Sequence, residues 1–226
     1  MERQTYQLLE EYMLSSMEDS AHDKDHIYRV LYLALDIASQ EQGVDLDRLI
    51  AACLLHDIGR KEQFEDPRVC HALVGGDKAY DFLCAHGFAP AYAQGVRDCI
   101  RTHRYRTDAQ PQSIEAKILF DADKLDVTGT LGIARALFYK GQVSQPLYTL
   151  TPDGQVSDGE GDEAPSFFHE YKYKLEKLYT RFYTARGAQL AAERQASAKA
   201  FYEAMLEEVR ASYGVGRTLL RQQLTQ

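Results

Sequence analysis

The sequence predicts an all-α fold, a bundle of amphipathic helices. Apolar residues recur at helical spacing along most of the chain, and few stretches alternate apolar and polar residues as a half-buried strand does. Hydrophobic residues make up 45% of the 226 residues and charged residues 27%, a composition typical of folded globular proteins. We therefore expect a single domain over residues 1–226 with a substantial core.

Glycine, proline and capping residues mark several of the helix boundaries. Gly43 ends the second helix, Asp45 is placed to cap the third, and Gly59 ends that third helix. Pro67 suits the first turn of a fourth helix, which runs to Gly87. The helices are expected at about residues 5–17, 23–40, 46–56, 67–87, 90–103, 113–125, 129–139, 166–186 and 188–212.

A polar segment over residues 141–165 interrupts the helices, because Gly, Asp, Ser, Thr and Pro are frequent there. This composition predicts a long flexible loop, a flap near a substrate entrance or at a partner surface. It lacks the alternating oxygen ligands of a calcium loop, so calcium binding is disfavoured. The aromatic residues of the C-terminal helices, 166–212, are expected to pack in a core, or else to form a dimer face or a pocket wall.

Charge and composition exclude several classes of protein. The chain has 26 Lys and Arg against 34 Asp and Glu, a formal charge of −8, which disfavours duplex nucleic acid as a partner. No run of 18 apolar residues predicts a membrane span, and the first residues do not resemble a secretion signal. Four cysteines without paired spacing are expected to be free thiols, so we expect a cytoplasmic protein.

Four residues are candidate metal ligands: His26, the adjacent pair His56 and Asp57, and Asp123. Both carboxylates follow apolar runs that should lie in the core, where an unpaired carboxylate is very costly. A divalent cation held by two imidazoles and two carboxylates would remove that cost, and this ligand mixture suits Mn²⁺, Fe²⁺, Co²⁺, Ni²⁺ or Zn²⁺ better than Ca²⁺. Adjacent residues of a helix point about 100° apart, so the pair can converge only near the helix end that Gly59 supplies. Four unrelated residues, each with an ordinary structural role, are the alternative.

The order His, His-Asp, Asp, with spacings of 30 and 66 residues, resembles the HD-domain superfamily of metal-dependent phosphohydrolases, and within it the small bacterial YedJ/YpgQ-like branch. The resemblance implies a helical HD fold with its metal-binding core at about 20–140, and hydrolysis of phosphoester or phosphoanhydride bonds, notably in nucleotides. The segments that carry it are His22–Val30, Leu54–Gly59, His71–Gly76, Ile100–Arg104 and Glu115–Asp126.

Basic residues near the ligands are candidates for binding phosphate. Arg29 lies one helical turn from the first ligand, where its guanidinium can hold phosphate oxygens; a salt bridge with Asp23 or Asp25 is the alternative. Arg60 and Lys61 follow the His-Asp turn, where they can neutralise phosphate or complement the helix end before them. We assign the phosphate contact to Lys61.

Three further residues are expected to assist catalysis. Asp126 follows the last ligand by one turn, so it can orient a ligand or a bound water. His71 and His103 can contact phosphate, hold a second metal, or be ordinary structural histidines. We favour one ion and phosphate contacts, because no further carboxylate near either histidine offers an obvious bridge between two metals.

The expected function is therefore hydrolysis of a nucleotide or related phosphate compound by a water that one divalent ion activates. Mn²⁺ or Mg²⁺ is the expected ion, with Fe, Co, Ni and Zn as alternatives. A dinuclear iron oxygenase on the same fold, with His71 and His103 as extra ligands, is the second hypothesis, and a non-catalytic regulatory module is the third. The expected partner is a small phosphorylated molecule, and the sequence leaves open whether the chain forms a homodimer.

Overall fold

The computed structural model describes residues 1–17, 24–104 and 109–224, and confirms the all-α prediction. Within these residues the only β structure is an isolated bridge between Leu150 and Val156. The chain divides into two compact units, residues 1–126 with 182–187 and residues 127–181 with 188–226. The single domain over 1–226 stays a prediction. None of the described helices combines the length and the apolar character that crossing a membrane requires.

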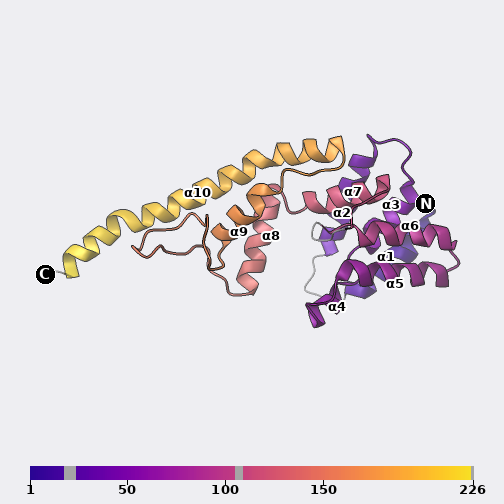
Figure 1. Ribbon diagram of the computed structural model, residues 1–226, viewed down its shortest axis with the longest axis horizontal. Coiled ribbons are helices and arrows are strands. Elements are labelled where there is room, and N and C mark those ends of the chain that lie inside the picture. Colours follow the sequence, from indigo (N-terminus) through magenta and orange to yellow (C-terminus); the bar gives the residue numbers. More distant parts are fainter. Residues whose placement is uncertain (18–23, 105–108, 225–226) are drawn as a thin grey trace. The chain divides into compact units, whose positions relative to one another are not determined.

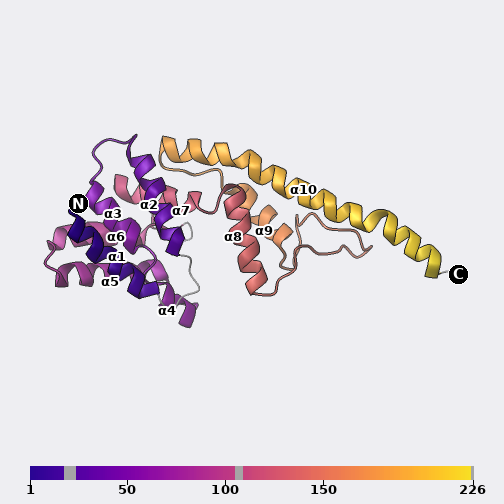
Figure 2. The same cartoon turned by 180° about the vertical axis from the view of Figure 1, so that it is seen from behind.

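The first unit consists of a helical bundle around an apolar core. Its centre includes Leu9, Ile27, Leu54 and Ile100, all fully buried. Figure 1 and Figure 2 show α5 and α6 side by side, joined by a short turn at Gly87. Its helices are α1 (Arg3–Met17), α2 (Lys24–Ala38), α3 (Leu46–Leu55), α4 (Arg60–Glu65), α5 (His71–Ala85), α6 (Pro90–Arg101) and α7 (Ile114–Leu125).

Helix ends place the candidate ligands in the first unit. Helix α3 begins at the expected cap, where the Asp45 side chain accepts from the backbone of Arg48, and it ends at Leu55. The turn after it passes very close to the start of α5: a Cβ on Gly59 would lie 2.4 Å from the carbonyl oxygen of His71. Only glycine fits this crossing, which holds the His-Asp turn against α5.

The second unit contains α8 (Gly129–Gln142), α9 (Phe167–Tyr173) and a 3₁₀ turn, Leu175–Lys177. Helix α10 runs from Ala185 to Leu224, and its residues from Ala188 onward belong to this unit. The expected aromatic core is present, since Phe167, Phe168, Tyr171 and Tyr202 belong to one buried cluster.

The polar segment between α8 and α9 is mostly exposed or half-buried. Asp162 nevertheless fixes part of it by accepting hydrogen bonds from Thr149 and Ser157, at 2.5 and 2.7 Å. Val156 and Ser157 are buried. The flexibility of this segment and its role as a flap stay predictions.

Three helix predictions differ from the structure. The expected helix over 166–186 ends at Tyr173, because the chain turns through the 3₁₀ segment and reaches a left-handed backbone at Arg181, with φ 70°. The expected helix over 67–87 begins only at His71, and α4 precedes it. Helix α10 continues past 212 through Gly214 and Gly216, since a single glycine costs a helix only about 1 kcal/mol.

Candidate metal centre

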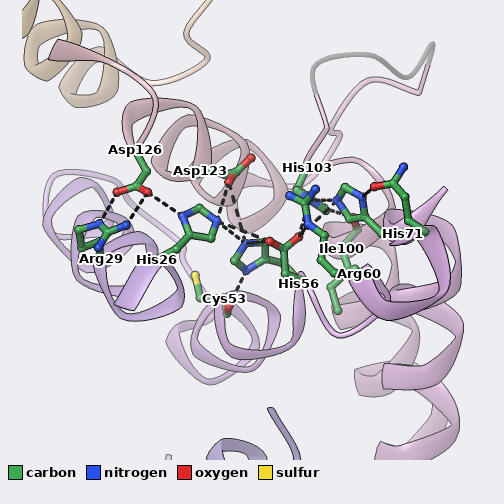
Figure 3. A network of polar contacts seen from close by, with 12 residues as sticks. His26, Arg29, Cys53, His56, Arg60, His71, Ile100, His103, Asp123 and Asp126 are labelled. Atoms are coloured by element: carbon green, nitrogen blue, oxygen red, sulfur yellow. Dashed lines mark hydrogen bonds and ion pairs between the residues drawn. The ribbon is translucent and has the colours of Figure 1, made fainter. Parts of the chain in front are cut away.

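Four histidines project from four different segments of the first unit into one buried space (Figure 3). Each places its Nδ1 at 2.6–2.7 Å from an oxygen that cannot donate, so each Nδ1 must carry the proton and donate it. This fixes the ring orientation and directs every Nε2 toward the shared space. The acceptors are Asp126 for His26, the Cys53 carbonyl for His56, Gln63 for His71 and the Ile100 carbonyl for His103.

The first ligand set comprises His26, His56, Asp123 and the Oδ2 atom of Asp57. His26 Nε2 lies 3.3 Å from His56 Nε2, 3.3 Å from Asp123 Oδ1 and 3.6 Å from Asp57 Oδ2. His56 Nε2 lies 3.6 Å from Asp57 Oδ2 and 3.9 Å from Asp123 Oδ1. The structure thus brings together the four residues that the sequence analysis named as metal ligands.

The second ligand set comprises His71, His103 and the Oδ1 atom of Asp57. The two Nε2 atoms lie 3.2 Å apart, and they lie 3.3 Å and 3.7 Å from Asp57 Oδ1. No carboxylate able to link these histidines to the first ligands is obvious in the sequence. The structure supplies one, because the two oxygens of Asp57 face different sets.

Both sets fit divalent cations. Two ligand atoms that each lie about 2.1 Å from one ion, at an angle of about 90–110°, stand roughly 3.0–3.4 Å apart. The Nε2–Nε2 distances of 3.3 and 3.2 Å fall in this range. The buried Asp57 Oδ1 accepts no hydrogen bond within the described part of the chain, although Arg60 Nε lies 2.9 Å away. A cation would satisfy this oxygen and the facing nitrogen lone pairs.

Nearby positive charges and hydrogen bonds lower the pKa of both carboxylates of the centre. Burial raises the pKa of Asp57, but the Arg60 guanidinium and the nearby imidazoles lower it more, so its pKa lies well below the usual range. Burial also raises the pKa of Asp123, yet its hydrogen bond with His26 brings the net value below normal. Both carboxylates are therefore ionised at neutral pH.

The imidazoles of the two sets differ in protonation. Burial lowers the pKa of His71 to about 2 and that of His103 to about 4, so both rings are neutral. Burial lowers the pKa of His26 as well, but Asp123 and Asp126 raise it more, to about 9. Without metal, His26 thus carries a proton that a bound ion must displace.

Asp126 and Arg29 form the outer support of the first set. Asp126 is fully buried and accepts from His26 Nδ1 at 2.7 Å and from Arg29 Nε and Nη2 at 2.7 and 3.1 Å. From this position Asp126 can orient the His26 ring, and its role in catalysis stays a prediction. Two of the Arg29 nitrogens bind this carboxylate, a partner the sequence analysis did not consider. Asp23, one of the two it did consider, lies outside the described residues.

The residues after the His-Asp turn are placed differently from the expectation. Arg60, three residues after Asp57, points its guanidinium at that carboxylate. Lys61 is exposed on α4, and none of the contacts described above involves it. Gln63, which orients His71, carried no signal in the sequence, since a glutamine near a glycine turn is commonplace.

The side chain of Asp123 is 24% exposed, whereas the other residues of the two sets are almost completely buried. Water or a substrate can therefore reach the centre on the Asp123 side.

Comparison with known proteins agrees with this geometry. The HD domain family model matches residues 24–128. The Bacillus subtilis protein YpgQ is 32% identical over 181 residues, which cover 78% of this chain and 79% of YpgQ. The crystal structure of YpgQ in complex with ADP has a TM-score of 0.70 at 26% identity and covers 91% of this chain and 95% of that one. A predicted HD superfamily hydrolase from an uncultured Thermotogales bacterium has a TM-score of 0.58 at 29% identity, with 91% of each chain covered. The fold, the paired histidine and aspartate ligands and these relatives show that the chain belongs to the HD-domain family.

Proposed function

We propose that this protein is a metal-dependent phosphohydrolase that cleaves a phosphoester or phosphoanhydride bond of a nucleotide. The observation that carries the proposal is the convergence of four oriented Nε2 atoms with the carboxylates of Asp57 and Asp123 in one buried space. The Thermotogales relative, a predicted HD superfamily hydrolase, supports hydrolysis as the reaction class. ADP bound to YpgQ supports a nucleotide as the substrate class.

The first ligand set is proposed to hold the resident ion. A divalent ion there supplies Lewis-acid polarisation of a phosphoryl oxygen and lowers the pKa of water. Two imidazole nitrogens among the ligands favour Mn²⁺ over Mg²⁺, which prefers oxygen. The protein's own groups do the positioning: Asp126 fixes His26, and Arg60 holds Asp57.

The second ligand set is proposed to bind a further, weaker ion rather than to donate to phosphate. His71 and His103 are neutral and their Nδ1 protons are already donated, so their Nε2 atoms offer lone pairs and no N–H. Once metal has displaced the proton of His26, the three carboxylates and two guanidiniums of the centre carry a net charge of −1. One divalent ion reverses this charge and a second makes it strongly positive, so substrate phosphate is expected to promote binding of the second ion.

The second ligand set also keeps an iron oxygenase as a second candidate, because an Asp57 carboxylate between two metal positions is what a coupled pair of iron ions requires. The two functions differ in metal and product. A coupled iron pair detected by electron paramagnetic resonance, with oxygen consumption, would favour the oxygenase.

A nucleotide panel tests the proposal. Purified protein is loaded with Mn²⁺, Mg²⁺ or Fe²⁺ and incubated with nucleoside mono-, di- and triphosphates, while phosphate and pyrophosphate are detected separately. We expect Mn²⁺-dependent release from at least one nucleotide, and pyrophosphate release would identify a pyrophosphohydrolase of triphosphates.

The matched variants are Asp57→Ala and Asp36→Ala. Asp36 lies ten residues after His26 on α2 and pairs with Arg186 rather than with a residue of either ligand set, so its loss should leave metal content unchanged. Asp57→Ala should lose both metal and activity. Full metal content in Asp57→Ala, or no hydrolysis of any nucleotide by the metal-loaded wild type, would contradict the proposal.

A further inference from the structure

A guanidinium lies against the carboxylate oxygen of the second ligand set. That oxygen, Asp57 Oδ1, lies 3.3 Å from His71 Nε2 and 3.7 Å from His103 Nε2. Arg60 Nε lies 2.9 Å from the same oxygen (Figure 3). The chain's own arginine therefore places a positive charge beside the atom that a second metal ion would bind.

The turn after α3 holds Arg60 in this place. The backbone N–H of Arg60 donates to the carbonyl oxygen of Asp57 at 3.0 Å. Lys78 fixes the same turn, because its Nζ donates to the carbonyl oxygen of Ile58 at 2.9 Å and to Glu62 of α4 at 2.8 Å. The backbone around Arg60 is therefore anchored, and its side chain, which is 28% exposed, is the part that can move.

The contact between Arg60 and Asp57 is an ion pair without a hydrogen bond. Arg60 Nε and Asp57 Oδ1 are both buried, and neither has a hydrogen-bond partner within the described residues. The oxygen thus keeps a lone pair for a cation. Because arginine stays protonated in proteins, an arriving ion cannot remove the opposing charge by releasing a proton. The ion must bind against the repulsion or push the guanidinium aside.

This repulsion acts mainly on the second ligand set. An ion about 2.1 Å from Asp57 Oδ1 would stand within about 5 Å of Arg60 Nε, since the two protein atoms are 2.9 Å apart. The first ligand set uses the other oxygen of this carboxylate, Oδ2. One arginine can therefore weaken the second metal position while it keeps Asp57 ionised for the first.

We propose that Arg60 sets the number of metal ions in the centre, by supplying at Asp57 Oδ1 the positive charge that a second ion would bring. Without phosphate, the centre then holds one ion, although His71 and His103 are both oriented for metal. Arg60 is a positioning residue in this scheme, because it acts on metal binding through Asp57. The inference rests on the proposed function and names what controls its second metal position.

Counting bound Mn²⁺ tests the inference. The full-length chain is stripped with chelator and dialysed against Mn²⁺ without nucleotide or phosphate, and the bound metal per chain is measured. We expect one ion in the wild type and two in Arg60→Gln, which should bind the second ion at least about 10-fold more tightly because a repelling charge is gone. Arg60→Lys keeps the charge and should keep one ion.

The matched control is Arg97→Gln, which should bind one ion as the wild type does. Arg97 is also half-buried, with 26% of its side chain exposed and its Nε buried without a hydrogen-bond partner in the described chain, but it pairs with Asp77. The double variant of Arg60→Gln with His71→Ala should return to one ion, which would locate the gained ion in the second ligand set. Spin coupling between two Mn²⁺ ions, detected by electron paramagnetic resonance, should appear in Arg60→Gln alone.

The sign of the change separates this role from simple support of the ligand. If Arg60 only holds Asp57 in place, Arg60→Gln should bind less Mn²⁺ than the wild type, and that result would overturn the inference. Two ions in the wild type without phosphate, or one ion in Arg60→Gln, would overturn it as well. If circular dichroism shows that Arg60→Gln has lost its helices, Arg60→Met, which keeps the apolar stem, takes its place.

These outcomes are distinct from a failure of the proposed function, because none of them involves turnover. A wild type that binds one Mn²⁺ but cleaves no nucleotide would contradict the proposed function and leave this inference standing. A wild type that binds no Mn²⁺ would contradict both.

Discussion

Replacing Asp126 by Asn tests how the first ligand set is built. The amide keeps the shape of the side chain but removes the charge that binds His26 Nδ1 and Arg29. The amide also places an NH₂ group, which cannot accept a hydrogen bond, where the carboxylate now accepts from His26 and Arg29. No direct ligand is altered, so any change in metal binding must act through the orientation and basicity of His26.

The expected magnitudes follow from these contacts. Loss of a carboxylate behind a ligating histidine typically weakens metal binding about 10- to 100-fold, roughly 1.4–2.7 kcal/mol. Without metal, the loss of charge-assisted hydrogen bonds should lower the free energy of unfolding by about 2–3 kcal/mol, discounted because the Arg29 side chain is 30% exposed.

The pH dependence gives the prediction a second, distinctive readout. Since the pKa of His26 is raised to about 9, a metal must displace its proton at neutral pH, and affinity falls as the pH falls. For one proton this predicts a loss of roughly 80-fold between pH 8.5 and pH 6.5 in the wild type. Asp126→Asn removes one cause of the raised pKa, so its affinity should be lower at pH 8.5 but depend less steeply on pH.

Chelator-competition titration with Mn²⁺ at several pH values measures both effects, and urea unfolding in excess chelator measures stability. Asp36→Asn is the matched control, because Asp36 binds Arg186 through the same two nitrogens, at 3.1 and 2.9 Å, without touching a ligand. The reasoning is refuted if Asp126→Asn binds Mn²⁺ within threefold of the wild type at pH 8.5 and shows the same slope with pH.

Three further changes probe the second set and the scaffold. With a phosphate compound present, His103→Ala should reduce the metal content from two ions per chain to one. Unchanged metal content with turnover lowered about 10²–10⁴-fold would instead favour a direct contact of His103 with phosphate. Gly59→Ala should lower the free energy of unfolding by several kcal/mol, because its Cβ would overlap the His71 carbonyl, and an unchanged urea midpoint would contradict that crossing. Asp121→Asn should cost about 2–3 kcal/mol in urea unfolding, since the buried Asp121 carboxylate accepts from the backbone and hydroxyl of Thr184 at 2.7 Å; a loss below 0.5 kcal/mol would show that these bonds contribute little.

Local signals in the sequence determined most of the helices. Apolar spacing and caps placed α2, α3, α6 and α7 within about two residues of their ends, because these features act within a single turn. The same spacing wrongly predicted one continuous helix over 166–186. A 3₁₀ turn and a residue with left-handed backbone interrupt the helix there, and the aromatic side chains are still buried in one cluster. Periodicity indicates which side chains are buried, and several backbone paths can bury the same set.

The sequence also pointed to the candidate metal ligands. Histidine and aspartate beside apolar runs can be recognised along the chain, since a buried carboxylate demands a partner wherever the fold places it. This argument singled out Asp57 and Asp123, and His26 and His56 were named with them because the order of the four resembles the HD-domain superfamily. The structure brings the four residues together.

Only the tertiary structure decided which of these residues face one another. The two oxygens of Asp57 face different pairs of histidines, and Arg60 rather than Lys61 reaches that carboxylate. These arrangements depend on the rotation of one helix against another, which brings residues together across as many as 100 positions of sequence, as between His26 and Asp126. Residue type fixes what a side chain can bind, but the direction in which it points is set by packing between helices, and no local pattern encodes that direction.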